Sequence, residues 1–263
     1  MIMHSMYADL RRLVRLLRLA GHFVVGPFIA HVLLRLVDYP RQQALSKWWN
    51  YKLCRILNLR IHIHGNINSQ PTLFVANHIS WLDINCLGSV LKAHFVSKQE
   101  VREWPVFGAM AARIGTLFLK RGDATVTSMV ADQMTWLLLQ KKSLVMFPEG
   151  TSSDGNSVDR FHARLFQSAI RSRTAVQAVA LSFPHEQGVN PLVPFIGDDN
   201  LLLHLWKLLS LPVVEVRLTF CKPIFAEGLD RRLLANHTRS QILSTFEFTS
   251  ASTPREKISA QGS

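Results

Sequence analysis

The spacing of apolar residues changes near residue 58, and the kind of element that the sequence predicts changes with it. In residues 7–20 (YADLRRLVRLLRLA), Arg11, Arg15 and Arg18 fall within about 60° of one another on a helix, and the leucines occupy the opposite side. This pattern predicts an amphipathic helix with a basic face.

A long apolar run, residues 19–34, follows directly. It is interrupted by His22, the pair Gly26-Pro27 and His31, and it is shorter than the roughly 20 residues that a spanning helix needs. We expect residues 5–57 to form two or three helices in or on a membrane surface, with tryptophan and arginine as interfacial anchors. The alternative is that these helices only cover the soluble core.

After residue 58, short apolar runs with strand-like periods alternate with helical patterns. This order predicts an α/β fold with a mixed, mostly parallel sheet flanked by helices. We expect membrane-associated helices in 1–57, an α/β domain in 58–249 and a disordered tail in 250–263. The predicted strands are 60–65, 72–76, 93–97, 116–120, 143–147, 176–182 and 213–220, and the predicted helices are 81–91, 104–112, 124–140 and 162–172.

Composition agrees with one large folded domain, because 48% of the 263 residues are hydrophobic. The net charge of +12 calls for an acidic partner, and residues 1–60 hold ten lysines and arginines against two aspartates. Because this charge lies on an apolar, amphipathic segment, we expect an anionic membrane surface rather than nucleic acid. A non-enzymatic basic protein that binds membrane or nucleic acid is the alternative of a different class.

Three cysteines are too few and too scattered for a disulfide framework or a zinc site of paired CxxC ligands. His62 and His64 share one strand face, but no third ligand is near them in the sequence, so we expect no metal site. The sequence also disfavours a serine hydrolase, because the chain has no G-x-S-x-G motif.

The first group of chemically capable residues is NHISWLD, residues 77–83, where a strand passes into a helix. Ser80 and Asp83 have the spacing of a helix-start capping box, which places His78 on the preceding loop and Asp83 in the first helical turn. A carboxylate there can orient an imidazole that acts as a general base. The alternative is that Asp83 only completes the cap and His78 is an ordinary loop residue.

Two further groups follow predicted strands. In FPEGTSS, Glu149, Gly150 and Thr151 form a tight turn whose N–H groups and side chains can bind an anion. In GTLFLKR, residues 115–121, Lys120 and Arg121 offer a cationic site for a phosphate.

Taken together and in this order, the three groups resemble the motifs of the glycerolipid acyltransferases, which include 1-acylglycerol-3-phosphate acyltransferase. NHISWLD is similar to their H-x4-D motif, GTLFLKR to their G-x-x-F-x-x-R block and FPEGT to their third block. The resemblance implies acyl transfer from acyl-CoA or acyl carrier protein to a lysolipid, without a metal or other cofactor. It also implies an α/β core on the cytoplasmic face of the inner membrane.

The resemblance also assigns site residues. It implies that His78 and Asp83 are catalytic, and that the two other blocks bind substrate through Gly115, Phe118, Lys120, Arg121, Glu149, Gly150 and Thr151.

The acceptor is predicted to be 1-acylglycerol-3-phosphate, which gives phosphatidic acid, but two positions depart from that branch. Arg164 stands where its members typically have glycine, and Ala178 stands where the fourth block usually has proline. The run TSSDG followed by F-x-x-x-L-F resembles the bacterial branch that includes lyso-ornithine lipid acyltransferases, so lyso-ornithine lipid is the alternative acceptor.

Overall fold

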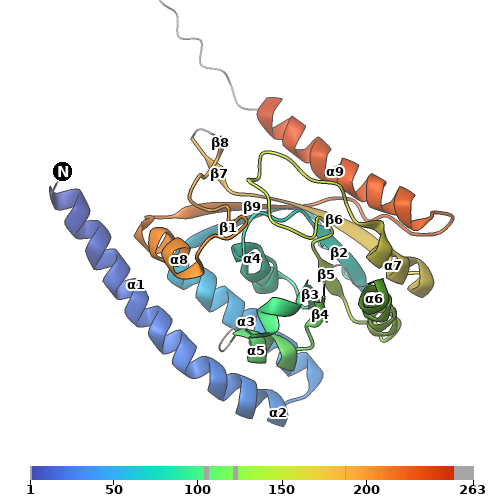
Figure 1. Cartoon of the computed structure of the whole chain (residues 1–263), viewed down its shortest axis with the longest axis horizontal. Coiled ribbons are helices and arrows are strands. Elements are labelled where there is room, and N and C mark those ends of the chain that lie inside the picture. The colour runs from blue at the N-terminus through green and yellow to red at the C-terminus, as the bar shows by residue number, and fades with distance from the viewer. Residues whose placement is uncertain (1, 104–106, 121–123, 187, 252–263) are drawn as a thin grey trace, which may run out of the picture.

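The computed structural model describes residues 2–103, 107–120, 124–186 and 188–251. A seven-stranded sheet in the order β1-β9-β6-β2-β5-β3-β4 forms its centre (Figure 1). All neighbours in this sheet are parallel except β6 and β9. The strands are β1 (Leu59–Gly65), β2 (Thr72–Ala76), β3 (His94–Lys98), β4 (Leu117–Leu119), β5 (Leu144–Met146), β6 (Ala175–Ser182) and β9 (Val214–Phe220), and β7 (Pro184–His185) pairs separately with β8 (Gly188–Val189).

The predicted mixed, mostly parallel sheet is thus confirmed, and each predicted strand is present within two residues of its expected bounds. Burial explains why the strands have different patterns. Every residue of β2 is buried because it lies between two other strands and under helices on both faces, whereas β9 alternates buried and half-buried positions.

Helices cover both faces of the sheet (Figure 1). One core cluster joins the sheet to α1, α3, α4 and α8, and a second joins it to α6, α7 and α9. The patterns predicted α4, α5, α6 and α7 but missed α8 and α9. Their bounds are α4 (Leu82–Val90), α5 (Phe107–Arg113), α6 (Ala124–Leu139), α7 (Gln167–Ser172), α8 (Leu201–Ser210) and α9 (Arg231–Ala251), with short 3-10 turns at Gln99–Glu103 and Ala163–Phe166.

The N-terminal region forms long helices, as the sequence predicts, but Pro27 does not end the first of them. Helix α1 (Ile2–Phe28) continues through a π-helical turn, Ile29–Leu33, into α2 (Leu34–Leu36), and α3 (Tyr39–Leu57) returns beside it. Proline lacks the N–H that a helix uses, and both prolines and single π-helical turns are usual sites at which a helix bends. Residues 7–36 thereby make one helical stretch that is long and apolar enough to cross a membrane.

Arg15, on the predicted basic face of α1, is 7% exposed and faces the protein. Its guanidinium donates to the main-chain oxygens of Leu209, Leu211 and Pro212 at the end of α8. Burial and the neighbouring Arg11 and Arg18 lower the pKa of Arg15. These carbonyls offset the cost of burying the charge, which the helical periodicity alone does not reveal.

The expected disorder of residues 250–263 lies mostly outside the described residues. Residues 250 and 251 belong to the last turn of α9, and residues 252–263 are not described. The division of the chain into a helical segment and an α/β domain stays a prediction, although β1 begins directly after α3.

Candidate active site

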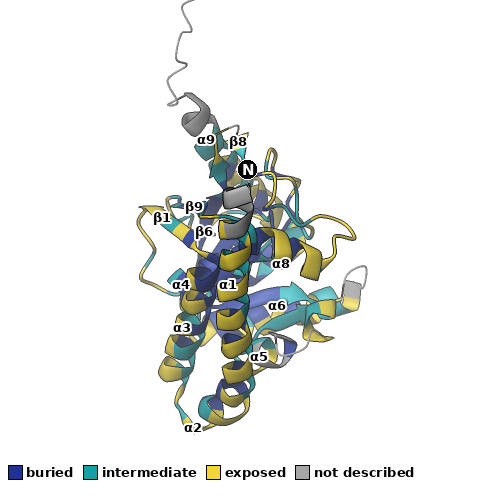
Figure 2. Cartoon of the chain, turned by 90° about the vertical axis from the view of Figure 1, so that its left-hand side faces the viewer, coloured by how far each residue is buried: buried dark blue, intermediate teal, exposed yellow. Residues whose placement is uncertain are grey.

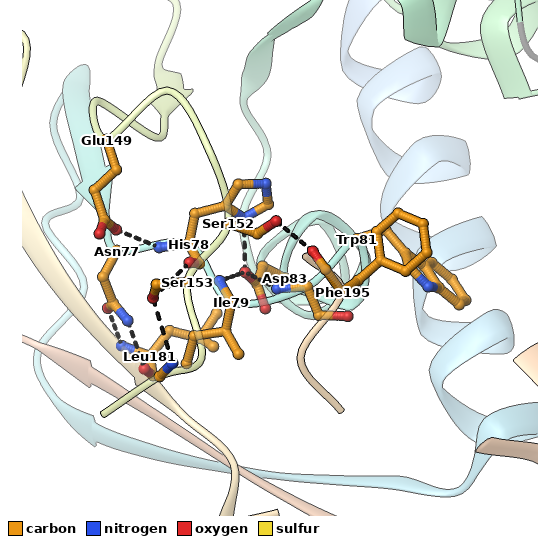
Figure 3. A network of polar contacts seen from close by, with 12 residues as sticks. Asn77, His78, Ile79, Trp81, Asp83, Glu149, Ser152, Ser153, Leu181 and Phe195 are labelled. Atoms are coloured by element: carbon orange, nitrogen blue, oxygen red, sulfur yellow. Dashed lines mark hydrogen bonds and ion pairs between the residues drawn. The ribbon is translucent and has the colours of Figure 1, made fainter. Parts of the chain in front are cut away.

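His78 and Asp83 meet at the point where β2 passes into α4 (Figure 3). His78 lies on the loop and Asp83 in the first turn of the helix, as expected from their spacing. Nδ1 of His78 is 2.8 Å from Oδ2 of Asp83. Because a carboxylate only accepts, Nδ1 carries the proton, and Nε2 keeps the lone pair that a general base uses.

Asp83 is fully buried and its Oδ2 has three donors. In addition to His78, the N–H groups of Ile79 and Ser80 donate to Oδ2 at 2.7 and 2.9 Å. These bonds fix the carboxylate and the loop that carries the histidine. The Ser80 hydroxyl does not cap the helix as predicted: it has no partner among the described residues, and only the carboxylate half of the capping box forms.

Glu149 holds the backbone of His78 instead of facing an open site. One carboxylate oxygen accepts the N–H of His78 at 2.7 Å, and the other accepts the N–H of Asp159 at 2.7 Å. Burial raises the pKa of Glu149, and these two N–H bonds oppose that shift. The carboxylate therefore ties the FPEGT turn to the histidine loop.

The residues around the FPEGT turn also support His78. The Phe147 ring stacks on the His78 ring with centroids 4.3 Å apart, and Ser153 donates to the His78 carbonyl from both its N–H and its hydroxyl. Ser152 donates to the carbonyl of Phe195 (Figure 3). Gly150 has a φ of +75°, a left-handed conformation that suits glycine, whereas Thr151 is exposed.

A cavity of about 170 Å³ opens in front of His78. Among the described residues that line this cavity, Lys98 is the single lysine or arginine. A second, almost wholly apolar cavity of about 130 Å³ lies between the N-terminal helices and the core. Both cavities are lined by Trp81, Ile84, Ser97 and Val101, so they adjoin each other near His78.

The GTLFLKR block reaches this site only in part. Leu119 lines the cavity in front of His78, Phe118 lies under the guanidinium of Arg102, and Lys120 is exposed. The predicted residue Arg121 lies outside the described residues, so its position is not known. Gly115 has another reason to be glycine.

Gly115 contacts a buried histidine. Its φ is +82°, and a Cβ at this position would lie 2.6 Å from Nδ1 of His94. That Nδ1 lies 3.1 Å from the Gly115 carbonyl, and Nε2 of His94 lies 2.9 Å from the hydroxyl of Tyr39 at the start of α3. The positive φ and the close His94 ring therefore require glycine at position 115, and its predicted contact with substrate stays a prediction.

Comparisons with known proteins agree with this geometry. The model of the family described as Acyltransferase matches residues 58–182. The chain is 39% identical to the lyso-ornithine lipid O-acyltransferase of Pseudomonas aeruginosa over 89% of this chain and 93% of that one. It is 34% identical to the 1-acyl-sn-glycerol-3-phosphate acyltransferase of Neisseria meningitidis over 65% of this chain and 67% of that one. The chain belongs to the acyltransferase family.

A solved structure shares the fold of this acyltransferase. The crystal structure of the 1-acyl-sn-glycerophosphate acyltransferase PlsC from Thermotoga maritima superposes with a TM-score of 0.70 at 18% identity, over 94% of this chain and 98% of that one. The predicted fold class and the predicted acyl-transfer chemistry are thus confirmed at the level of fold and family.

Two residues of the acyltransferase site were missed by sequence reasoning. Lys98 belongs to β3, and only the pairing of β3 with β5 and β4 brings it beside the histidine. Arg239 on α9 donates to the carbonyls of Val158 and Asp159, and Asp159 in turn donates to Glu149. Neither residue lies in a motif, so no sequence signal pointed to them.

The histidine pair His62 and His64 has no metal-binding surroundings in the described residues, where no three His, Cys, Asp or Glu side chains gather. His62 instead lies 2.7 Å from a carboxylate oxygen of Glu215 on β9.

Proposed function

We propose that this acyltransferase moves a fatty acyl group from a thioester to the free hydroxyl of lyso-ornithine lipid, with His78 as general base and Asp83 as the group that orients it. The observation that carries the proposal is the His78–Asp83 pair beside a cavity that adjoins a second, apolar cavity. Acyl-CoA or acyl carrier protein would serve as the donor, and no metal or cofactor enters the reaction.

In the proposed reaction, Nε2 of neutral His78 takes the proton of the acceptor hydroxyl while the hydroxyl oxygen attacks the thioester carbonyl carbon. The tetrahedral intermediate then collapses, the carbon–sulfur bond breaks, and the imidazolium returns the proton to the leaving thiolate. The carboxylate of Asp83 stabilises the imidazolium between these steps. No acyl-enzyme is needed, because both substrates can meet at the same imidazole.

The adjoining cavities suit the two parts of a lipid substrate. The apolar cavity can hold an acyl chain, since its walls are mainly leucine, isoleucine, phenylalanine and tryptophan side chains. The cavity in front of His78 can hold the reacting hydroxyl, and Lys98 in its wall can bind an acidic headgroup. Lys120 and Arg121 are proposed to add positive charge for the same headgroup.

The choice of acceptor rests on similarity over nearly the whole chain. The relative from Pseudomonas aeruginosa, which matches over 93% of its length, is a lyso-ornithine lipid O-acyltransferase, as are similar proteins of Brucella abortus and Rhizobium meliloti. The departures at Arg164 and Ala178 agree with this choice. The second candidate is 1-acylglycerol-3-phosphate, which the relative from Neisseria meningitidis supports.

The N-terminal helices are proposed to lie on the cytoplasmic side of the inner membrane. The exposed side of α1 is rich in apolar residues, and the buried Arg15 holds its other side against the core. Such a helix suits one leaflet, with the arginines of the segment at the headgroups. The active site would then meet its lipid acceptor at the membrane surface.

The experiment uses purified protein in detergent with labelled acyl-CoA or acyl carrier protein, and with lyso-ornithine lipid or 1-acylglycerol-3-phosphate. We expect product from lyso-ornithine lipid, its loss in His78→Ala, and a large fall in Asp83→Asn. The matched control is His62→Ala, an exposed histidine that also faces a carboxylate and should keep full activity.

Product only from 1-acylglycerol-3-phosphate would overturn the acceptor but keep the mechanism. Substantial activity in folded His78→Ala would overturn the mechanism itself.

A further inference from the structure

Helix α8 has apolar residues on two opposite sides. Its inner side packs into the core through Leu208 and Leu209, whereas Leu202, Leu203 and Trp206 on its outer side are 74%, 64% and 47% exposed. A surface helix of a soluble protein is usually polar on its outer side, and a group of large exposed apolar side chains indicates an interaction surface.

Helix α8 is held beside α1 by contacts with two arginines of α1. The guanidinium of Arg15 donates to the carbonyls of Leu209 and Leu211 at 3.1 and 2.6 Å, and the guanidinium of Arg12 lies 5.0 Å from the centre of the Trp206 ring. These contacts hold the two helices side by side.

Both helices have exposed turns, and they lie side by side (Figure 2). On α1, Leu10, Leu13 and Leu17 are exposed, and exposed turns of α8 lie next to α1 in the same view. Exposed basic residues border this surface, including Arg18 on α1 and Lys207 on α8. Apolar side chains bordered by cations, with a tryptophan among them, fit an anionic lipid surface.

We propose that the outer side of α8, formed by Leu202, Leu203 and Trp206, is a second lipid-contacting surface that enters the same leaflet as α1. This inference rests on the proposed membrane association. A lipid occupant is favoured over a protein partner because α8 also forms a cavity wall through Leu201 and Leu205. In this position, α8 separates the bilayer from the apolar cavity by a single helix.

Fluorescence of Trp206 gives the first test. The difference between wild type and Trp206→Phe isolates this side chain among the six tryptophans. With vesicles of anionic phospholipid, we expect the Trp206 emission to shift to shorter wavelength and to be quenched by lipids with brominated acyl chains. Emission that stays unquenched while the protein is bound to vesicles would overturn the proposal.

Vesicle binding of charged variants gives the second test. Leu202→Glu combined with Leu203→Glu should weaken binding about tenfold or more, because two leucines no longer enter the lipid. The control is Leu233→Glu on α9, which is 47% exposed away from α1 and should bind like wild type. Thermal unfolding checks that both variants are folded.

Activity in detergent separates this proposal from the proposed function. The double variant should keep the wild-type rate in detergent, where no bilayer is required, whereas His78→Ala should have none. Wild-type vesicle affinity of the folded double variant would overturn the lipid surface and leave acyl transfer intact. If the double variant changes its oligomeric state but keeps the vesicle affinity of wild type, the lipid surface is also overturned. The outer side of α8 would then be assigned to contact with a second copy of the chain.

Discussion

Replacing Glu149 with glutamine separates a structural role of this carboxylate from a role in binding substrate. Each carboxylate oxygen accepts one main-chain N–H, from His78 and from Asp159. Glutamine offers one acceptor oxygen and one NH2 donor. Whichever way the amide is turned, one buried N–H then faces another donor.

The expected loss follows from these two contacts. A hydrogen bond to a charged acceptor contributes about 1.5–3 kcal/mol, and a buried N–H without an acceptor costs about 1–3 kcal/mol. Burial raises the pKa of Glu149 and so reduces the benefit of its charge, which places the net loss of unfolding free energy at roughly 2–3 kcal/mol. For a chain of this size, the melting temperature should fall by roughly 5–10 °C.

Thermal unfolding and steady-state kinetics test both parts of this prediction. Because Glu149 positions His78, we expect kcat to fall about tenfold or more while the KM for the lysolipid stays within about twofold. The control is Glu215→Gln, which makes the same chemical change where Arg60 and His62 meet the carboxylate at an exposed edge. That variant should lose at most about 1 kcal/mol.

The opposite kinetic pattern would refute the reasoning. If Glu149→Gln melts like wild type but raises the acceptor KM about tenfold, the carboxylate binds the substrate, as the resemblance of FPEGT to the family's third block implies.

Three further predictions concern the supports of the site. Gly115→Ala should lower the unfolding free energy by about 2 kcal/mol or more in denaturant titration, because of the positive φ and the close His94 ring. Burial lowers the pKa of His94, so below pH 6.5 the unfolded chain takes up a proton that the folded chain does not, and stability falls with decreasing pH. His94→Gln should remove that part of the pH dependence, measured by denaturation between about pH 7.5 and about pH 5. Arg239→Ala should lower kcat more than the acceptor KM rises, and Arg239→Lys should restore part of the rate, because a lysine can still donate to the Val158 carbonyl.

The sequence was sufficient to locate the strands of the large sheet and to bring His78 and Asp83 together, because both depend on local spacing. A strand that ends at His78, followed by a helix that begins near Asp83, fixes the separation of the two side chains within a few residues. Apolar runs likewise marked the buried strands of the large sheet, since these need apolar residues on both faces, whereas the two-residue strands β7 and β8 were not predicted.

The features that sequence reasoning missed depend on contacts between distant segments. The burial of Arg15 was not foreseen, because its acceptors belong to the end of α8, near residue 210. Glu149 was assigned to an anion site because its two N–H partners are set by tertiary folding. Helix α8 itself was missed because its ten residues are mainly leucine, and a short apolar run does not distinguish a helix from a buried strand by its period alone.

The pairing of β1 with β9 sets an order in which the chain can fold. Arg60 on β1 and Glu215 on β9 bond across 155 positions of sequence, so β1 has no partner strand until nearly all of the chain has been synthesised. During that time the N-terminal helices have already left the ribosome. Contacts of such long sequence separation form slowly, and an unpaired strand edge invites aggregation. Early attachment of α1 and α3 to a membrane would keep nascent chains apart while they wait for β9.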